Sequence, residues 1–215
     1  MPPLPRRQLG FAFNTISKAE NANGNNTPVV LEVFVDFTCP YSKRMFDTLI
    51  NDVQPYYGNK LNIIIQPQPQ PWHPSSCVVH ECFHAACIVA NENDDVNLDL
   101  MNEILSTTMK VTMIKFADVH TIDMSRRQIH IAFADIYESL GINRDAFLLC
   151  LELDTTNEQV NGGNKATQLV KYYVKQSRQL SIHVTPTIRI NGIIADSSSS
   201  WNLSEWNTFL DPMYC

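Results

Sequence analysis

One stretch decides the fold of this 215-residue chain: Val33-Phe34-Val35-Asp36-Phe37-Thr38-Cys39-Pro40-Tyr41-Ser42-Lys43. The residues from Val29 to Phe37 are mostly β-branched or aromatic, which predicts a buried strand. From Ser42 to Val53 the apolar residues recur at helical spacing, which predicts a helix. Cys39 is therefore expected at a helix N-terminus, where free backbone N–H groups and the helix dipole favour a thiolate.

A second informative stretch lies late in the chain and reads Val184-Thr185-Pro186-Thr187-Ile188-Arg189-Ile190-Asn191-Gly192. Proline is tolerated at the first residue of an edge strand. A cis peptide bond before a proline is usually a retained structural feature of the fold. The pair Asn191-Gly192 separates the apolar runs Ile188–Ile190 and Ile193–Ala195, which predicts a tight hairpin turn.

Together these two stretches resemble the thioredoxin superfamily, most closely its disulfide-bond protein A (DsbA)-like branch. In that branch a Cys-x-x-Cys motif opens the first helix, a cis-proline faces it, and a helical domain is inserted between the two halves of the fold. The 146 residues between Cys39 and Pro186 leave room for such an insertion. The resemblance implies an α/β thioredoxin-like fold, with a central mixed sheet built from a β-α-β unit and a β-β-α unit.

The resemblance also implies a division of the chain into three parts. Residues 1–27 would form an N-terminal strand, near positions 10–14, and a flexible segment. Residues 28–73 and 182–215 would form the thioredoxin-like domain, and residues 74–181 the helical insertion. A further strand is expected at 61–66, and helices are expected at 75–90, 123–140, 143–151, 165–180 and 203–210.

The chain departs from the DsbA-like motif at Ser42, which stands where the second cysteine is expected. A serine hydroxyl can donate a hydrogen bond to a thiolate but cannot form a sulfur–sulfur bond. Cys39 could attack a disulfide, yet release of the mixed disulfide would need an external thiol, such as glutathione, or a second thiol on the substrate. The leading prediction is a monothiol thiol–disulfide oxidoreductase in which Cys39 is the nucleophile and Ser42 stabilises its thiolate.

Further site residues follow from the resemblance. Pro40 and Tyr41 would shape the turn that carries the thiol. The backbone of Thr185, before Pro186, would pair with an extended peptide or with the cysteinyl backbone of glutathione.

Three other residues are candidates for the rim of the site. Trp72 and His73 end a proline-rich connector and are expected near Cys39. The alternative is a simple linker, in which Trp72 packs at the domain boundary. His183 precedes the proline loop and could border the thiol, or it could be an ordinary surface residue.

Two alternative functions remain open at this point. Kappa-class glutathione transferases and 2-hydroxychromene-2-carboxylate isomerases share the architecture and use a serine near this helix start, which would make Ser42 the residue that orients a glutathione thiolate. A fold without a resolving cysteine could also be a non-catalytic peptide-binding module. No tightly bound cofactor is predicted. The candidate partners are glutathione and protein or peptide thiols and disulfides.

A competing motif is His80-Glu81-Cys82-Phe83-His84, which matches the H-E-x-x-H pattern of zinc proteases. Histidines at i and i+4 share a helix face and could bind zinc, with Glu103 as a third ligand. The thioredoxin-like pattern already explains the flanking elements, so we predict no metal here. His80, Glu81 and His84 are instead expected to form a polar stripe on a buried helix.

The remaining cysteines predict no disulfide framework. Cys77, Cys82 and Cys87 recur every five residues, so successive thiols are rotated by about 140° around the helix and neighbours cannot bridge. They are expected to be reduced core thiols, and Cys150 a small buried hydrophobe. Cys215 is expected to be an exposed terminal thiol.

Composition excludes one class of function. The chain is 44% hydrophobic and 18% charged, so it can bury a core without disulfides. Its net charge is −6, and its 16 Lys and Arg residues form no dense run, which argues against a nucleic-acid binder. No apolar stretch has the length of a signal peptide or a membrane span, so a soluble, cytoplasmic protein without a membrane partner is predicted.

Overall fold

The computed structural model describes residues 9–13, 27–91, 97–153, 155 and 160–214. Within these residues the strands form one sheet in the order β1-β3-β2-β4-β5. They are β1 (Phe11–Ala12), β2 (Val29–Val35), β3 (Leu61–Pro67), β4 (Thr187–Ile190) and β5 (Ile193–Ala195). β2 and β3 are parallel, and every other neighbouring pair is antiparallel. The mixed thioredoxin-like sheet predicted from the sequence is confirmed.

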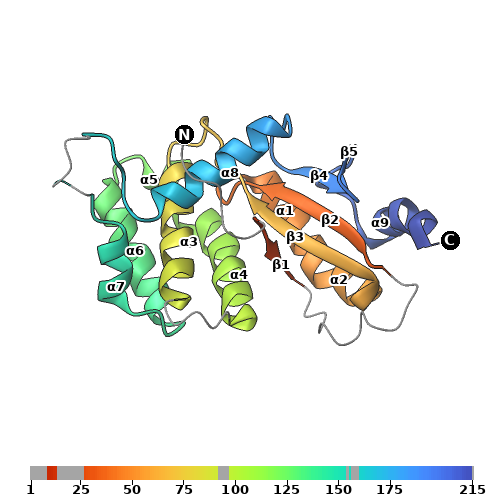
Figure 1. Cartoon of the computed structure of the whole chain (residues 1–215), viewed down its shortest axis with the longest axis horizontal. Helices are drawn as coiled ribbons and strands as arrows, with labels where there is room; N and C mark the ends of the chain where they lie inside the picture. Colours follow the sequence, from red (N-terminus) through yellow and green to blue (C-terminus); the bar gives the residue numbers. More distant parts are fainter. Residues whose placement is uncertain (1–8, 14–26, 92–96, 154, 156–159, 215) are drawn as a thin grey trace.

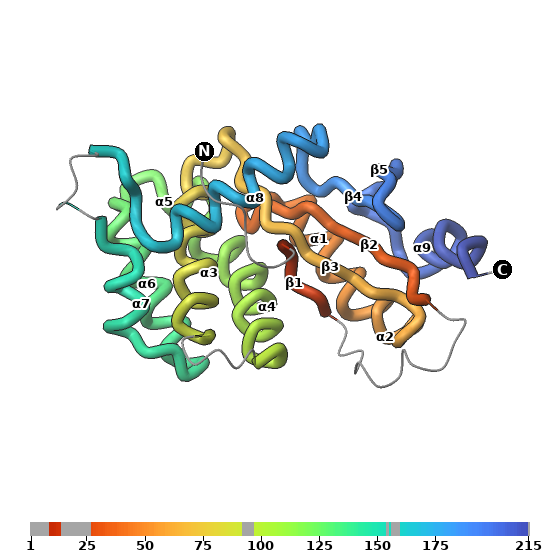
Figure 2. Tube along the Cα trace, viewed as in Figure 1, coloured from red at the N-terminus to blue at the C-terminus, as the bar shows by residue number. Residues whose placement is uncertain are grey.

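The helices lie mainly between β3 and β4 in the sequence. They are α1 (Pro40–Thr48), α2 (Gln54–Tyr57), α3 (Ser76–Ala90), α4 (Leu98–Lys115), α5 (Asp118–Thr121), α6 (Arg126–Glu138), α7 (Arg144–Cys150), α8 (Thr167–Gln179) and α9 (Leu203–Leu210). Helices α3 to α7 form a bundle at one end of the molecule, and the sheet with α1, α2 and α9 forms the other end (Figure 1). Helix α8 crosses from the bundle back to the sheet and leads into β4 (Figure 2).

Strand β2 lies at the centre of the sheet, between β3 and β4. Its side chains are buried almost without interruption, as expected for a strand covered on both faces. Leu31, Val33 and Val35 are fully buried. Glu32 is the one charged residue of this otherwise apolar strand, and its carboxylate lies 3.1 Å from Arg189 Nη1 on β4. It also accepts a hydrogen bond from Gln66 Nε2 on β3, so the charge is balanced across the sheet.

The first helical region differs from the predicted one in both its ends. It begins at Pro40 rather than Ser42, because proline fits the first helical position, where its missing N–H costs nothing. A π-helical segment, Leu49–Val53, then continues directly into α2, so the helical path extends to Tyr57.

Helix α4 is an element that the sequence analysis did not predict. Its start carries an available signal, since the Asn97 side chain accepts a hydrogen bond from Leu100 N in the standard capping position. Its apolar pattern is obscured by Thr108 and Thr112. Both threonines are buried, and each hydroxyl donates to the carbonyl oxygen four residues earlier.

The sheet and the helical bundle share one continuous hydrophobic core, which includes residues from β2, α1, α3, α6 and α9. The predicted domain boundaries, near residues 73 and 182, therefore stay a prediction. β1 lies in the segment predicted to start with a strand, whereas residues 14–26 of the predicted flexible segment lie outside the described residues. No helix in the described part of the chain combines the length and the apolar composition that crossing a membrane requires.

Phe83 on α3 provides a test of how the bundle is joined to the sheet. Its ring centroid lies 4.8 Å from that of Phe37, after β2, and 4.8 Å from that of Phe11 on β1. Phe83→Ala should lower the free energy of unfolding by about 3–5 kcal/mol, measured by urea denaturation. Ile114→Ala on the exposed side of α4 is the control and should cost under about 0.5 kcal/mol. Equal losses in the two variants would contradict this role of Phe83.

Candidate active site

Cys39 lies at the N-cap of α1, as the strand-to-helix pattern predicts. Its backbone is extended, Pro40 occupies the first helical position, and Lys43 N donates to the Cys39 carbonyl oxygen at 3.0 Å. The Sγ atom donates a hydrogen bond to the Thr185 carbonyl oxygen at 3.4 Å. The thiol is therefore held between the start of a helix and a loop that lies 146 positions later in the chain.

The Thr185 loop is fixed by the sheet. The Thr185–Pro186 peptide bond is cis, and β4 begins at the next residue. Thr187 is paired with Phe34 of β2, so the loop lies at the end of β2 from which the Cys39 segment leaves. The cis-proline loop thus faces the thiol, which is the arrangement that the resemblance implies.

Ser42 is fully buried, and its hydroxyl oxygen accepts a hydrogen bond from Asp36 N at 3.3 Å. Among the described residues no hydrogen bond joins the Ser42 hydroxyl to the Cys39 thiol, so stabilisation of the thiolate by Ser42 stays a prediction. The Cys39 side chain is buried as well, so burial does not distinguish the two residues as the group that meets a glutathione molecule. The alternative in which Ser42 orients a bound glutathione thiolate stays a prediction.

The most densely bonded side chain near the thiol is Asp36, at the end of β2, which the sequence analysis did not single out. Its carboxylate is fully buried. Its Oδ1 atom accepts hydrogen bonds from Thr38 N (3.0 Å), Thr38 Oγ1 (2.8 Å) and Ser76 Oγ (2.8 Å), and it lies 3.3 Å from His80 Nε2. Its Oδ2 atom accepts a hydrogen bond from Gln70 N (3.0 Å) and lies 2.8 Å from His73 Nδ1. A signal was available in the sequence, because an acidic residue within a buried apolar run must find donors.

These contacts set the protonation of the group. Burial disfavours the charged carboxylate, but the hydrogen bonds with His73 and His80 outweigh it and hold the pKa of Asp36 well below its usual value. The hydrogen bond with Asp36 in turn raises the pKa of His73, against the opposing effect of partial burial. Asp36 and His73 therefore form an ion pair at mildly acidic pH.

The predicted rim residues are placed as follows. His73 is bonded to Asp36, three residues before Cys39, and its ring lies edge-on to exposed Trp72 at 6.2 Å. Tyr41 and His183 are also exposed. Within the described part of the chain, no hydrogen bond or ring contact joins Trp72, His73 or His183 directly to Cys39. Their roles in substrate binding stay predictions.

The H-E-x-x-H residues have three separate environments. His80 faces Asp36, Glu81 forms an ion pair with Arg126 and accepts from Thr167 Oγ1, and His84 stacks on Tyr173 with centroids 5.0 Å apart. Burial also keeps the pKa of His84 well below its ordinary value.

The expectation of a polar stripe is wrong, because all three side chains are buried within the fold. Among the described residues, no group of three or more His, Cys, Asp and Glu side chains could hold a metal ion.

Among the other described cysteines, Cys77, Cys82 and Cys87 form no disulfide. Cys82 and Cys87 are buried, and burial raises the pKa of each thiol well above its ordinary value. Cys150 is buried as predicted, whereas Cys77 is exposed, which corrects the expectation of a core thiol. Cys215 lies outside the described residues.

Asp36→Asn should lower the free energy of unfolding by about 3 kcal/mol at mildly acidic pH, because it breaks a buried charge pair. The lowered pKa of Asp36 makes its contribution present above the unfolded value of 3.8 and lost as the pH falls. The raised pKa of His73 makes its contribution present below 6.5 and lost as the pH rises through the folded-state value. The difference from wild type, measured by urea denaturation, should therefore be largest between pH 3.8 and 6.5.

Asp135→Asn is the matched control, since this exposed carboxylate pairs with Arg144 at 3.0 Å on the surface. It should cost under about 1 kcal/mol at every pH. A difference for Asp36→Asn that does not change with pH would show that the Asp36–His73 pair is not ionised in the folded protein.

Comparisons with known proteins agree with this geometry. A family model described as Thioredoxin matches residues 18–211, and comparison with curated sequences finds no significant match. A solved structure of a candidate protein-disulfide isomerase from Pseudomonas syringae is 25% identical, with a TM-score of 0.65, over 94% of this chain and 97% of that one.

Two further solved structures share the fold. BdbD from Bacillus subtilis is 12% identical, with a TM-score of 0.61, over 94% of this chain and 91% of that one. The catalytic domain of Proteus mirabilis ScsC is 17% identical, with a TM-score of 0.57, over 88% of this chain and 85% of that one. The chain therefore belongs to the thioredoxin family of thiol–disulfide oxidoreductases, and its inserted helices follow the DsbA-like branch that the sequence resembles.

Proposed function

We propose that this protein is a monothiol thiol–disulfide exchange enzyme that uses Cys39 as its nucleophile and an external thiol to release its product. The observation that carries the proposal is the position of Cys39, at the first turn of α1 and 3.4 Å from the Thr185 carbonyl oxygen. A dithiol site has a second cysteine that resolves the mixed disulfide, and this chain has the buried Ser42 at that position. In this proposal the Cys39-Pro40-Tyr41-Ser42 motif provides the attacking thiol but no resolving thiol.

The first step is attack by the Cys39 thiolate on one sulfur of a substrate disulfide. A bond forms between Cys39 Sγ and that sulfur, and the other sulfur leaves as a thiolate, which then takes a proton from solvent. Cys39 and the attacked sulfur now form a mixed disulfide. The backbone N–H groups at the start of α1 favour the thiolate form that this step requires.

The second step releases the substrate. An external thiolate, such as that of glutathione, attacks the substrate sulfur, which forms a new disulfide with the substrate and returns Cys39 as a thiolate. When the attacking thiolate is the substrate's own, the disulfide is rearranged without net oxidation or reduction. No group on α1 replaces these thiols, because a hydroxyl cannot accept the sulfur bond.

A polypeptide is the substrate class that the surroundings of the thiol favour. The exposed side chains of Tyr41 and Val184 are next to the Cys39 turn and the Thr185 loop in the sequence, and exposed Trp72 contacts His73. Such apolar groups suit an extended peptide, whose backbone would pair with Thr185. The name of the Pseudomonas syringae relative, a candidate protein-disulfide isomerase, points to the same class of substrate. The cytoplasmic location stays a prediction.

Ser42→Cys tests the role of the missing resolving thiol. In wild type the release of a peptide that has a single cysteine, held on Cys39, should require glutathione and should increase with its concentration. In the variant the introduced thiol resolves the mixed disulfide internally, so at about 0.1 mM glutathione release should be at least about tenfold faster. Release is measured by quenching with acid and quantifying the mixed disulfide by mass spectrometry.

Three controls accompany this measurement. Ser42→Ala should keep the dependence on glutathione, and Cys39→Ser should form no mixed disulfide at position 39. Cys77→Ser should react as wild type, because among the described residues no hydrogen bond joins this exposed thiol to Cys39. Rapid release from wild type in the absence of any external thiol would refute the monothiol mechanism.

A further inference from the structure

Positive charge is concentrated in the part of the chain that leads into the thiol site. Residues 159–195 contain five of the 16 Lys and Arg residues and none of the 22 Asp and Glu residues, in a chain whose net charge is −6. This part includes α8 and the Thr185–Pro186 loop. A local positive field on an otherwise negative protein selects partners that carry negative charge.

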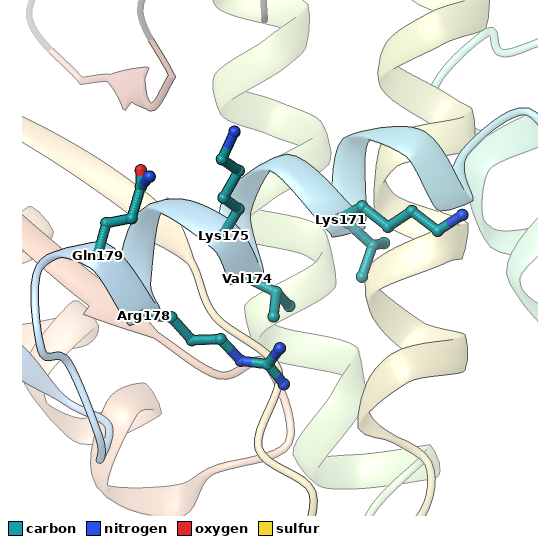
Figure 3. Close-up of a pocket in the computed structure, with 6 residues that line it drawn as sticks. Lys171, Val174, Lys175, Arg178 and Gln179 are labelled. Atoms are coloured by element: carbon teal, nitrogen blue, oxygen red, sulfur yellow. The ribbon is translucent and has the colours of Figure 1, made fainter. Parts of the chain in front are cut away.

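Three of these five cations line a groove along α8. The groove has a volume of about 320 Å³ and is lined by Val170, Lys171, Val174, Lys175, Arg178 and Gln179. Figure 3 shows Lys175 and Gln179 on one side of the helix, with Val174 and Arg178 on the other. The lining residues repeat at i and i+4, so they form two rows along the helix, Val170-Val174-Arg178 and Lys171-Lys175-Gln179.

The three cations of the groove are not used to hold the fold together in the described part of the chain. There the ion pairs of Lys and Arg side chains involve Lys43, Arg126, Arg144 and Arg189. Lys171, Lys175 and Arg178 form none of these pairs. Their charges are therefore available to a ligand, and the half-buried Val170 and Val174 offer it an apolar surface.

We propose that the α8 groove docks an acidic, partly apolar segment of the polypeptide whose cysteine reacts at Cys39; the reaction itself rests on the function proposed above. Carboxylates of the segment pair with Lys171, Lys175 and Arg178, and an apolar side chain contacts the valines. Helix α8 ends at Gln179, and the loop at 181–184 continues to Thr185, whose carbonyl oxygen lies beside Cys39 Sγ. One extended substrate can therefore contact the groove and the thiol.

A polypeptide fits this groove better than a nucleic acid or a membrane surface. Binding to a polyanion depends on cations spread over a wide surface, whereas these lie along a single helix of a protein with net charge −6. The valines that line the groove give an apolar contact that a phosphate backbone does not need. Because the pairs are exposed, docking should weaken as salt concentration rises.

The direct test is binding of a cysteine-free peptide of about 12 residues in which Asp and Glu alternate with Leu, compared with the same peptide carrying Asn and Gln. Fluorescence anisotropy is measured on the full chain and on two triple variants with the same change in charge. The groove variant is Lys171→Gln, Lys175→Gln, Arg178→Gln; the control variant, on exposed positions of α4 and α6, is Lys110→Gln, Lys115→Gln, Arg127→Gln.

The groove variant should bind the acidic peptide about tenfold more weakly, from the loss of three ion pairs at the surface of the groove. The control variant should bind it as wild type does. Equal losses in the two variants, or no preference of wild type for the acidic peptide, would overturn the proposal. It would also be overturned if a single-stranded oligonucleotide or phosphatidylserine vesicles displaced the peptide and bound the groove more tightly than the peptide does.

A kinetic test separates docking from the chemistry at Cys39. Wild type should exchange with a disulfide of the acidic peptide about tenfold faster than with a disulfide of the neutral one, and the groove variant should lose this preference. Bis(2-hydroxyethyl) disulfide, which has no charge, should react equally with both proteins. If it reacts but the acidic preference is missing, docking is refuted and the monothiol reaction stands. If it does not react at all, the proposed function fails, and the anisotropy result alone decides docking.

Discussion

The buried carboxylate of Asp36 is the constraint on which the site depends. A charge without solvent costs several kcal/mol unless donors surround it, and here the donors come from the Thr38 turn, from the connector after β3 and from α3. Meeting this requirement brings three separate segments to the end of β2. Cys39 follows Thr38 directly, so the position of the thiol is set by the same group.

This arrangement joins the helical bundle to the reacting part of the molecule. Ser76 and His80 extend from α3 to Asp36, and Phe83 of the same helix packs on Phe37. Helix α8 then returns the chain from the bundle to the loop that faces the thiol. The inserted helices therefore support the Asp36 end of β2 and also carry the cationic groove, so the proposed reaction and the proposed docking use different elements.

Because Ser42 replaces the second cysteine of a dithiol site, the proposed enzyme must hold its substrate in a different way. A dithiol enzyme can release any substrate through its own second cysteine, whereas the proposed monothiol enzyme holds the mixed disulfide until another thiol arrives. A longer-lived intermediate favours contacts away from the reacting sulfur, because these orient the substrate while it is bound. The cations of the α8 groove, which form no ion pair with the described residues, suit this proposed task, since they are near the site in the chain but take no part in the chemistry.

The features that depend on neighbouring residues could be predicted from the sequence: the strand before Cys39, the helix after it, the hairpin at Asn191, and the limits that Ser42 places on the chemistry. It did not reveal the contacts of Asp36, the burial of His80, Glu81 and His84, or helix α4, whose apolar pattern is interrupted by buried threonines. These depend on contacts between distant segments, such as the bond from Cys39 to Thr185 across 146 positions. They could not be predicted from the sequence, because local periodicity identifies an element and its buried face but not the partner that covers it.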